Sequence, residues 1–504
     1  MGPAGKEDKQ MRKRLSLGLI LALAVSLVLP GTALAQGEGL GADLEALKLE
    51  LDMTWVIVSA VLVLFMQAGF LLLEIGFSRQ KNVGAGVAKI LINVSIASVA
   101  WWVIGYGISG PGSKLVGTDG FFFHAGQDIA GTVVTGDVVA LMLFGFMFCA
   151  VSLAIVWGTT LERIKFGAYV VYAIVFAAVI YPIVAHSVWS GEGLLDDIGG
   201  KEVLDFAGSS VVHLTGATAG LAALLLLGAR AGKYGPDGKP RAIPGHSMPL
   251  VGLGVLILWV GWYGFNAGSA LGTSDVLFAE VALNTQLAAA AGVIGALAVV
   301  YMKTKSLDVG MGGNGAIAGL VGITAPCGYV EFWAAPIIGL VAGVLVVYSV
   351  LAIEKYIDDP VGALSAHGMA GVWGTVAVGL FATPRLIDPE TSSPGLWYGI
   401  IGESSFDAGL GQLGVQAVGV AATFAFVLVA SVAVFYAIRM TIGLRVPEDQ
   451  ELAGLDISTH GMYGYPEQFI PPEEYPTLPV EPHVAGTPVG AAPATAPAQR
   501  PTSG

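Results

Sequence analysis

The chain has 504 residues, of which 55% are hydrophobic and only 12% are charged, with a formal net charge of −13. A soluble domain carries about 25% charged residues, so this composition excludes an ordinary soluble protein, and the mean hydropathy of +0.74 agrees. The 71 glycines suit helices that pack closely in lipid. The sequence has no stripe of basic residues of the kind that would indicate a nucleic-acid partner. Cys149 and Cys327 lie in apolar stretches without metal-ligand spacing.

The N-terminus has the pattern of a secretory signal peptide. A positive run at Arg12–Arg14 precedes an apolar core at Leu15–Leu29, and Ala33-Leu34-Ala35 follows as an A-x-A cleavage site. We therefore expect residues 1–35 to be a signal peptide that is cleaved after Ala35. The alternative is an uncleaved first helix.

Eleven apolar segments that could cross a membrane follow the signal. A spanning helix needs about 20 mostly apolar residues, and the fold class predicted from these segments is an all-α membrane protein with eleven transmembrane helices. The segments run approximately over residues 54–77, 86–108, 137–158, 165–188, 207–228, 248–269, 278–302, 309–326, 331–353, 362–383 and 413–438.

The basic residues of the loops predict an orientation. Most of them fall in alternate loops, which the positive-inside rule places in the cytoplasm. We expect a multi-pass protein of the cell (inner) membrane, with the mature N-terminus outside and the C-terminus inside. The predicted cytoplasmic set is Arg79, Lys81, Arg163, Lys165, Arg230, Lys233, Lys239, Arg241, Lys303, Lys305, Lys355, Arg439 and Arg445, against Lys48, Lys114, Lys201 and Arg385 on the other side.

Composition also divides the mature chain. Residues 36–445 form the predicted membrane domain, and residues 446–504 form a predicted cytoplasmic C-terminal region. From about residue 466 this region is rich in proline, alanine and threonine, a composition typical of disorder.

A faint internal repeat links two histidines. His213 in the fifth predicted span and His367 in the tenth are each followed by small residues three and seven positions later, which places all three on one helical face. Two five-helix halves of inverted topology plus one extra helix would produce this pattern. Transporters often have such repeats, with the binding site at their interface.

Several runs, each on its expected span, resemble one family. Asp205 to His213 reads DFAGSSVVH, and Gly261 to Ser269 reads GWYGFNAGS. Together with other runs over residues 53 to 465, they resemble the ammonium transporter (Amt/Mep/Rh) family, in its bacterial Amt branch. The first run departs at Ser209, where the family usually has a second glycine, and we expect this change to be tolerated. The other runs are Met66–Phe70, Gly315–Thr324, Asp358–Pro360, Ala366–Gly368, Gly443–Val446 and Gly454–Gly461.

The resemblance implies that His213 and His367 are the family's twin histidines, which line the pore at mid-membrane. An ionisable residue inside a membrane helix is costly and is a functional candidate by default, although either alone could be a structural histidine. Two imidazoles that share a hydrogen bond can present one donor and one acceptor to the pore. Such a pair could accept a proton from ammonium or hold neutral ammonia.

The resemblance also implies an outer site. Phe148 and Phe265 would be stacked rings that gate the outer pore, and Phe144, Trp189 and Ser269 would recruit ammonium. Aromatic faces attract cations, and a serine hydroxyl can accept a hydrogen bond from the ion. The plainer alternatives are core packing for the phenylalanines and an interfacial anchor for Trp189.

Three further ionisable residues stand at the ends of predicted spans. Asp205 could be a helix N-cap, a support for the outer site, or both. Glu74 and Lys89, near the cytoplasmic ends of the first two spans, could form an ion pair, or each could snorkel to water. The remaining histidines are assigned no chemistry, and they are His124, His186, His246, His460 and His483.

These residues predict an ammonium transporter or channel. Ammonium resembles potassium in size and charge, but only ammonium can give up a proton, so a hydrophobic pore that passes the neutral molecule discriminates between the two ions. We expect recruitment, deprotonation and passage past the twin histidines. The alternatives are an ammonium sensor with the same fold and a gas channel of the Rh type.

No enzyme motif is evident, and we expect no cofactor and no metal site. The resemblance implies a homotrimer with one pore in each subunit. It also makes a PII signalling protein a possible partner at the cytoplasmic face.

Overall fold

The computed structural model describes residues 4–273 and 275–466, with side chains from residue 41 onward. The long apolar segments fold as helices because a helix satisfies its own backbone N–H and C=O groups, for which lipid offers no partners. Within the described residues, ten helices are long and apolar enough to cross a membrane, and Val309–Thr324 is a shorter apolar helix. The predicted all-α membrane fold is confirmed, and its eighth span is shorter than the others.

The helices of the bundle follow the predicted order. They are α1 (Ala4–Phe77), α2 (Val83–Ala100), α4 (Gly136–Thr159), α5 (Phe166–Val175) continued by α6 (Tyr181–Trp189), α7 (Thr215–Leu227), α8 (Met248–Asn266), α9 (Leu277–Thr304), α10 (Val309–Thr324), α11 (Ala334–Ile353), α12 (Ala370–Phe381) and α14 (Phe406–Thr441).

Short segments extend or connect these helices. Four are π-helical, namely η2 (Trp101–Gly105), η3 (Phe176–Ile180), η4 (Ser209–Leu214) and η6 (Leu364–Met369). The others are η1 (Gln80–Asn82), α3 (Tyr106–Ser109), the antiparallel pair β1 (Asp128–Ile129) and β2 (Thr132–Val133), η5 (Ala267–Ala270), α13 (Leu396–Ile400), α15 (Glu448–Ala453) and α16 (Leu455–His460).

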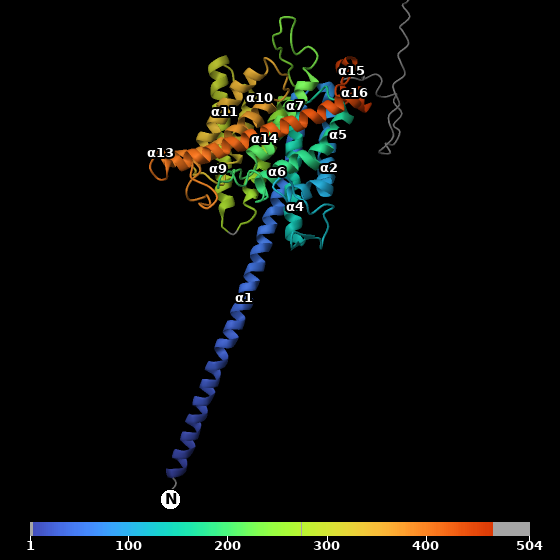
Figure 1. Ribbon diagram of the computed structural model, residues 1–504. Coiled ribbons are helices and arrows are strands. Elements are labelled where there is room, and N and C mark those ends of the chain that lie inside the picture. The colour runs from blue at the N-terminus through green and yellow to red at the C-terminus, as the bar shows by residue number, and fades with distance from the viewer. Residues whose placement is uncertain (1–3, 274, 467–504) are drawn as a thin grey trace, which may run out of the picture.

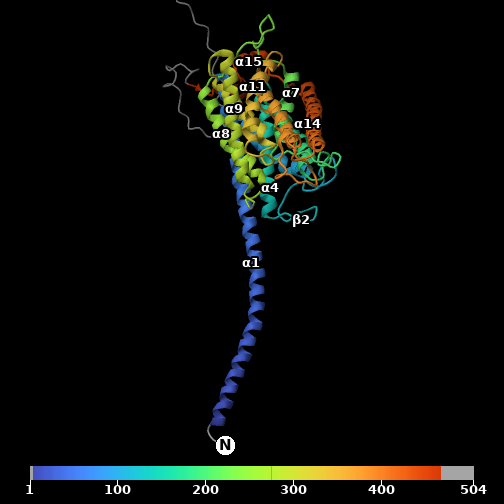
Figure 2. The same cartoon turned by 90° about the vertical axis from the view of Figure 1, so that its left-hand side faces the viewer.

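The helices form one bundle, and α14 crosses its outside beside α7 and α12 (Figures 1 and 2). The N-terminal part of α1 projects from one end of the bundle, and α15 and α16 lie at the opposite end. We refer to these ends as the predicted outer side and the predicted cytoplasmic side. The predicted cleavage after Ala35 falls within α1 and stays a prediction.

Small residues let the helices approach closely, as the glycine content suggests. A Cβ atom added at Gly339 or Gly343 of α11 would overlap the backbone carbonyl oxygens of Ala288 and Gly292 on α9. Neither position could therefore carry a larger side chain without separating the two helices.

The first part of the predicted C-terminal region is ordered and bound to the bundle. The Asp456 carboxylate accepts a hydrogen bond from the Ala85 N–H at 2.8 Å, and the Leu455 N–H donates to the Asn82 side chain at 2.9 Å. The Glu451 carboxylate pairs with Arg445 at 2.6 Å. The disorder predicted from about residue 466 falls on residues outside those that the structure describes.

A buried ion cluster joins the loops of the predicted cytoplasmic side. The Asp358 carboxylate accepts two hydrogen bonds of 2.9 Å from the Arg230 guanidinium, and Arg163 lies 3.9 Å from the same carboxylate. Glu162 pairs with Arg79 at 2.6 Å and with Arg230 at 3.5 Å. Burial alone would raise the pKa of Asp358, but the hydrogen bonds of Arg230 and the two guanidinium charges lower this pKa to about 2.

We expect Asp358→Asn to destabilise the protein by about 3–5 kcal/mol, because two buried guanidinium groups lose their counter-ion. A depressed folded-state pKa stabilises the protein above the unfolded pKa, and the gain is lost as pH falls toward the folded value. The difference in Tm between wild type and variant should therefore be constant at neutral pH and shrink below about pH 4. Thermal unfolding in detergent measures this difference.

The control is Asp237→Asn, whose exposed carboxylate lies 3.9 Å from Lys239 and should contribute little. An equal effect of the two variants would contradict the prediction.

Candidate functional site

The two predicted site histidines meet at the centre of the bundle. His213 lies on η4 and His367 on η6, so both stand on π-helical segments, which often mark functional sites. The side chain of His213 is fully buried and that of His367 is 5% exposed. Their Nδ1 atoms are 3.3 Å apart, and their rings are stacked with an interplanar angle of 27°.

The contact between the two Nδ1 atoms determines the chemistry of the neutral pair. One Nδ1 must donate and the other must accept, because two N–H groups cannot share this bond. The donating ring then has a bare Nε2, and the accepting ring has an Nε2–H. Within the described residues the Nε2 of His213 has no hydrogen-bond partner. The pair therefore offers a donor and an acceptor to a small polar molecule.

A common local structure positions both histidines. Gly208 and Gly362 precede the two π-helical segments with φ of 111° and 78°, a conformation that a residue with a Cβ atom rarely adopts. Asp205 and Asp359, three residues before each glycine, accept hydrogen bonds from the backbone N–H groups that follow. The internal repeat is thus D-x-x-G-x-x-x-x-H in both halves. The repeat visible from the residues after each histidine does not include Asp359, which was quoted within the Asp358–Pro360 run but given no role.

A column of rings leads to the histidines from the predicted outer side. The rings of Phe148 and Phe265 are stacked, with centroids 4.1 Å apart and an interplanar angle of 24°. Phe144 meets Phe148 edge-on at 4.6 Å, and Phe265 lies 5.5 Å from His213. Phe148 and Phe265 are almost fully buried. These contacts give Phe148 and Phe265 the stacked arrangement expected of them and leave no open path between the rings.

The residues predicted to recruit ammonium line one open cavity outside this stack. Its volume is about 380 Å³, and it is bounded by Phe144, Phe148, Trp189, Phe206 and Ser269, among others. Aromatic faces can attract a small cation, and the lining offers four aromatic residues and a hydroxyl. Phe206 also lines the cavity. It lies in the Asp205–His213 run but was given no role, because the run does not show that its ring packs against the cavity. The Ser269 hydroxyl donates to the Phe265 carbonyl oxygen at 2.9 Å, which leaves its lone pairs as acceptors.

Asp205 is only 3% exposed and supports the outer cavity through hydrogen bonds rather than by lining it. One carboxylate oxygen accepts from the N–H groups of Gly208 and Ser209, and the other accepts from those of Ser210 and Val211. Its backbone carbonyl oxygen accepts a 2.7 Å hydrogen bond from Trp189 Nε1. The same residue therefore closes the start of the span and holds the Trp189 ring in place.

The departure at Ser209 has a structural explanation. Its hydroxyl donates to the Val321 carbonyl oxygen at 2.7 Å and accepts from the Ala325 N–H at 2.7 Å. Both bonds join η4 to the end of α10. The hydroxyl is fully buried but satisfied, so it does not incur the free-energy cost of an unpaired polar group.

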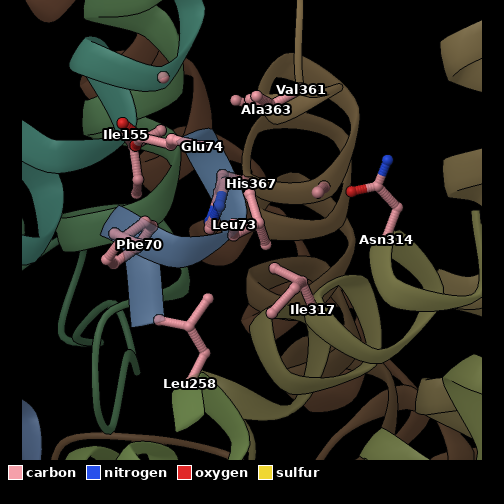
Figure 3. Close-up of a pocket in the computed structure, with 12 residues that line it drawn as sticks. Phe70, Leu73, Glu74, Ile155, Leu258, Asn314, Ile317, Val361, Ala363 and His367 are labelled. Atoms are coloured by element: carbon pink, nitrogen blue, oxygen red, sulfur yellow. The ribbon is translucent and has the colours of Figure 1, made fainter. Parts of the chain in front are cut away.

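A second, smaller cavity lies beyond His367 toward the predicted cytoplasmic side. Its volume is about 20 Å³, which is room for one water-sized molecule. Phe70, Glu74, Asn314, Val361 and His367 are among its lining residues (Figure 3). The Phe70 ring lies 6.2 Å from that of His367. Sequence reasoning gave Phe70 and Asn314 no role, since they come from separate helices and share no motif.

The structure shows neither of the two arrangements proposed for Glu74 and Lys89. Both side chains are buried, at 2% and 1% exposure, so neither snorkels to water. Among the described side chains, Lys89 Nζ and Glu74 Oε2 have no hydrogen-bond partner, and no direct ion pair joins them. Lys89 Nζ instead lies 3.6 Å from the centroid of the Trp157 ring. Neither the ion pair nor the snorkelling considered from the sequence is found, and the aromatic face of Trp157 contacts the ammonium group instead.

His186, one of the histidines that were assigned no chemistry, is held by the backbone. Both ring nitrogens of His186 contact backbone carbonyl oxygens, those of Gly110 and Ser113, at 2.9 and 2.7 Å. These two contacts fix the position of the His186 ring. His483 lies outside the described residues.

A helical bundle of membrane spans that encloses two ring-lined cavities on either side of a buried histidine pair is typical of a membrane transport protein for a small solute. Residues 54–465 match the sequence profile of the group described as the Ammonium Transporter Family. The chain belongs to the ammonium transporter family, as its motifs suggested.

Relatives and solved structures agree with this placement. The chain is 40% identical to ammonium transporter Amt2 of Archaeoglobus fulgidus over 85% of this chain and 91% of that protein. It is 34% identical to the ammonium transporter of Bacillus subtilis over 82% and 98%. Among solved structures it is similar to a sensor Amt protein, with a TM-score of 0.75, 33% identity and coverage of 82% and 99%. Mep2 of Candida albicans has a TM-score of 0.68, 29% identity and coverage of 79% and 87%.

Proposed function

We propose that the protein carries ammonium across the membrane by binding the ion, removing its proton and passing neutral ammonia along the histidine pair. The observation that carries this proposal is the 3.3 Å contact between the Nδ1 atoms of His213 and His367. It lies between the two cavities, where a pair with one donor and one acceptor can take a proton and hold ammonia.

The apolar stack in front of the histidine pair explains the selectivity for ammonium over potassium. Potassium cannot lose its charge, and an unpaired ion in a low-dielectric interior costs far more than a neutral molecule. The Phe148–Phe265 stack leaves only apolar surface between the outer cavity and the histidines. Side-chain motions part the two rings, the ion gives up its proton to the histidine pair behind them, and ammonia passes on in its neutral form.

Each predicted site residue has a role in this proposal. Phe144, Trp189 and Ser269 bind the ion in the outer cavity, and Phe148 and Phe265 gate the passage. Asp205 keeps the cavity in shape through its backbone contacts.

The orientation and the assembly are part of the same proposal. We place the membrane domain at residues 36–445 in the inner membrane, after removal of residues 1–35, with the N-terminus outside and the C-terminus in the cytoplasm. The asymmetry of the loop charges and the placement of α15 and α16 opposite to the N-terminal part of α1 support this orientation. We further propose a homotrimer, and a PII protein that binds the cytoplasmic side.

The decisive experiment measures current from proteoliposomes of purified wild-type protein after a rapid ammonium pulse. We expect a current with ammonium and none with potassium at the same concentration. Ammonium can pass its proton to the histidines, and the proton and ammonia then both cross, whereas potassium cannot divide in this way. Empty liposomes are the control for passive ammonia diffusion. The absence of an ammonium current from folded protein would contradict charge-carrying transport.

A sensor role is the second candidate, favoured by the similarity to a solved sensor Amt protein. A chain that ends at residue 466 distinguishes the two functions. Normal current together with a lost cellular response to ammonium would support the sensor, whereas an unchanged response would support the transporter alone.

A further inference from the structure

Two buried ionisable side chains belong neither to the ring column nor to the outer cavity, and one of them, Glu74, lines the inner cavity. Glu74 on α1 and Lys89 on α2 are buried inside membrane-spanning helices, where charged groups are costly. A charge kept at such a place needs a structural partner or a function.

Glu74 lies next to the path of the substrate. It stands one helical turn beyond Phe70 on the same face of α1, and the Phe70 ring is 6.2 Å from that of His367. Glu74 and His367 line the same cavity of about 20 Å³ (Figure 3). One water-sized molecule, such as ammonia or water, therefore fits between the histidine pair and the carboxylate.

The Glu74 carboxylate makes no structural hydrogen bond through Oε2 among the described residues. Among the described side chains, Glu74 Oε2 has no hydrogen-bond donor, and the carboxylate packs near Gly158, where an added Cβ atom would lie 3.1 Å from Oε1. A structural carboxylate is normally satisfied by donors, as Asp205 and Asp358 are. Glu74 has a free acceptor instead.

Lys89 is a positively charged neighbour whose attraction favours the ionised form of this carboxylate. The two groups attract each other through the low-dielectric interior, while Trp157 binds the ammonium group at 3.6 Å. The ring holds Lys89 away from direct contact, so it does not block the carboxylate. Three further titratable groups act on this pair from neighbouring elements, namely Arg163, Tyr169 and His460.

We propose that Glu74 is the inner proton acceptor of the transport cycle, which takes the proton from the histidine pair and releases it to the cytoplasm. An N–H bond of the protonated His367 breaks, an O–H bond forms on Glu74 through the molecule in the cavity, and the imidazole returns to its neutral form. The proton then leaves Glu74 for cytoplasmic water, and ammonia leaves uncharged. This assignment rests on the proposed function.

The test separates a proton acceptor from a structural charge. Glu74→Gln alone leaves Lys89 uncompensated and risks misfolding, whereas the double variant Glu74→Gln, Lys89→Met removes both buried charges and should fold. We expect the ammonium current of the double variant to fall about a hundredfold, the size of a lost acid–base group. Its permeability to uncharged ammonia, measured by stopped flow on the same vesicles, should stay unchanged. The matched control is Glu50→Gln on the same helix, whose side chain is exposed.

The outcomes are distinguishable. A folded double variant with wild-type current would overturn the assignment, because a structural pair can be neutralised without loss of function. A parallel loss of current and of ammonia permeability would overturn it as well, since it would indicate a closed pore. If wild-type protein itself carries no ammonium current, the proposed function fails and this assignment fails with it.

Discussion

Replacing both imidazoles, as His213→Ala and His367→Ala in one chain, is expected to abolish the preference for ammonium over potassium. The rings now fill the centre of the bundle, and His213 packs within 5.5 Å of both Trp262 and Phe265. Removing them opens a space bounded by backbone and the Phe148–Phe265 stack, which water can enter when polar groups remain nearby. A hydrated opening solvates potassium as well as ammonium.

The measurement is the ratio of ammonium to potassium current in proteoliposomes. We expect this ratio to fall by about a hundredfold, which corresponds to about 2.7 kcal/mol of lost selectivity. His246→Ala is the matched control, because His246 is a partly buried histidine that bonds Ser78 and Tyr465 away from the ring column. If the double variant still rejects potassium, the aromatic stack and not the histidine pair is the filter.

The spans could be predicted from the sequence because they depend on local composition. Hydropathy alone placed most ends of the long helices within a few residues, although α1 begins well before residue 54 and α14 begins at Phe406 rather than 413. The motif runs placed the two histidines on the fifth and tenth spans. The positions of the outer-cavity residues followed from the resemblance. None of these inferences required knowledge of which helices touch.

The inner cavity could not be predicted in this way. Phe70 and Asn314 come from α1 and α10, and only the packing of these helices beside η6 brings them together. The surroundings of Lys89 depend likewise on where the Trp157 ring of α4 lies. Asp359 was different, since its spacing to Gly362 and His367 repeats that of Asp205 to Gly208 and His213 and was visible in the sequence.

The substitution Asp205→Asn is expected to weaken both the stability of the fold and the binding of ammonium. An asparagine has one acceptor oxygen, so its amide N–H₂ would face two of the four backbone N–H groups that now donate to the carboxylate. Each buried N–H without an acceptor costs about 1–3 kcal/mol. The altered loop would also misplace the carbonyl oxygen that accepts from Trp189 Nε1 at 2.7 Å.

We expect the ammonium concentration for half-maximal current to rise about tenfold, equivalent to one lost charge-assisted hydrogen bond. Asp359→Asn is the matched variant, because Asp359 accepts from the N–H groups of Gly362 and Leu364 in the same local structure but lies at the other end of the path. It should lower the Tm by less, because two rather than four cited N–H groups donate to it, and it should leave the half-saturating concentration unchanged. A similar rise in both variants would mean that the effect of Asp205 is general loosening of the bundle. A rise in Asp205→Asn alone would show that this carboxylate acts on the outer cavity through the Trp189 ring that it holds.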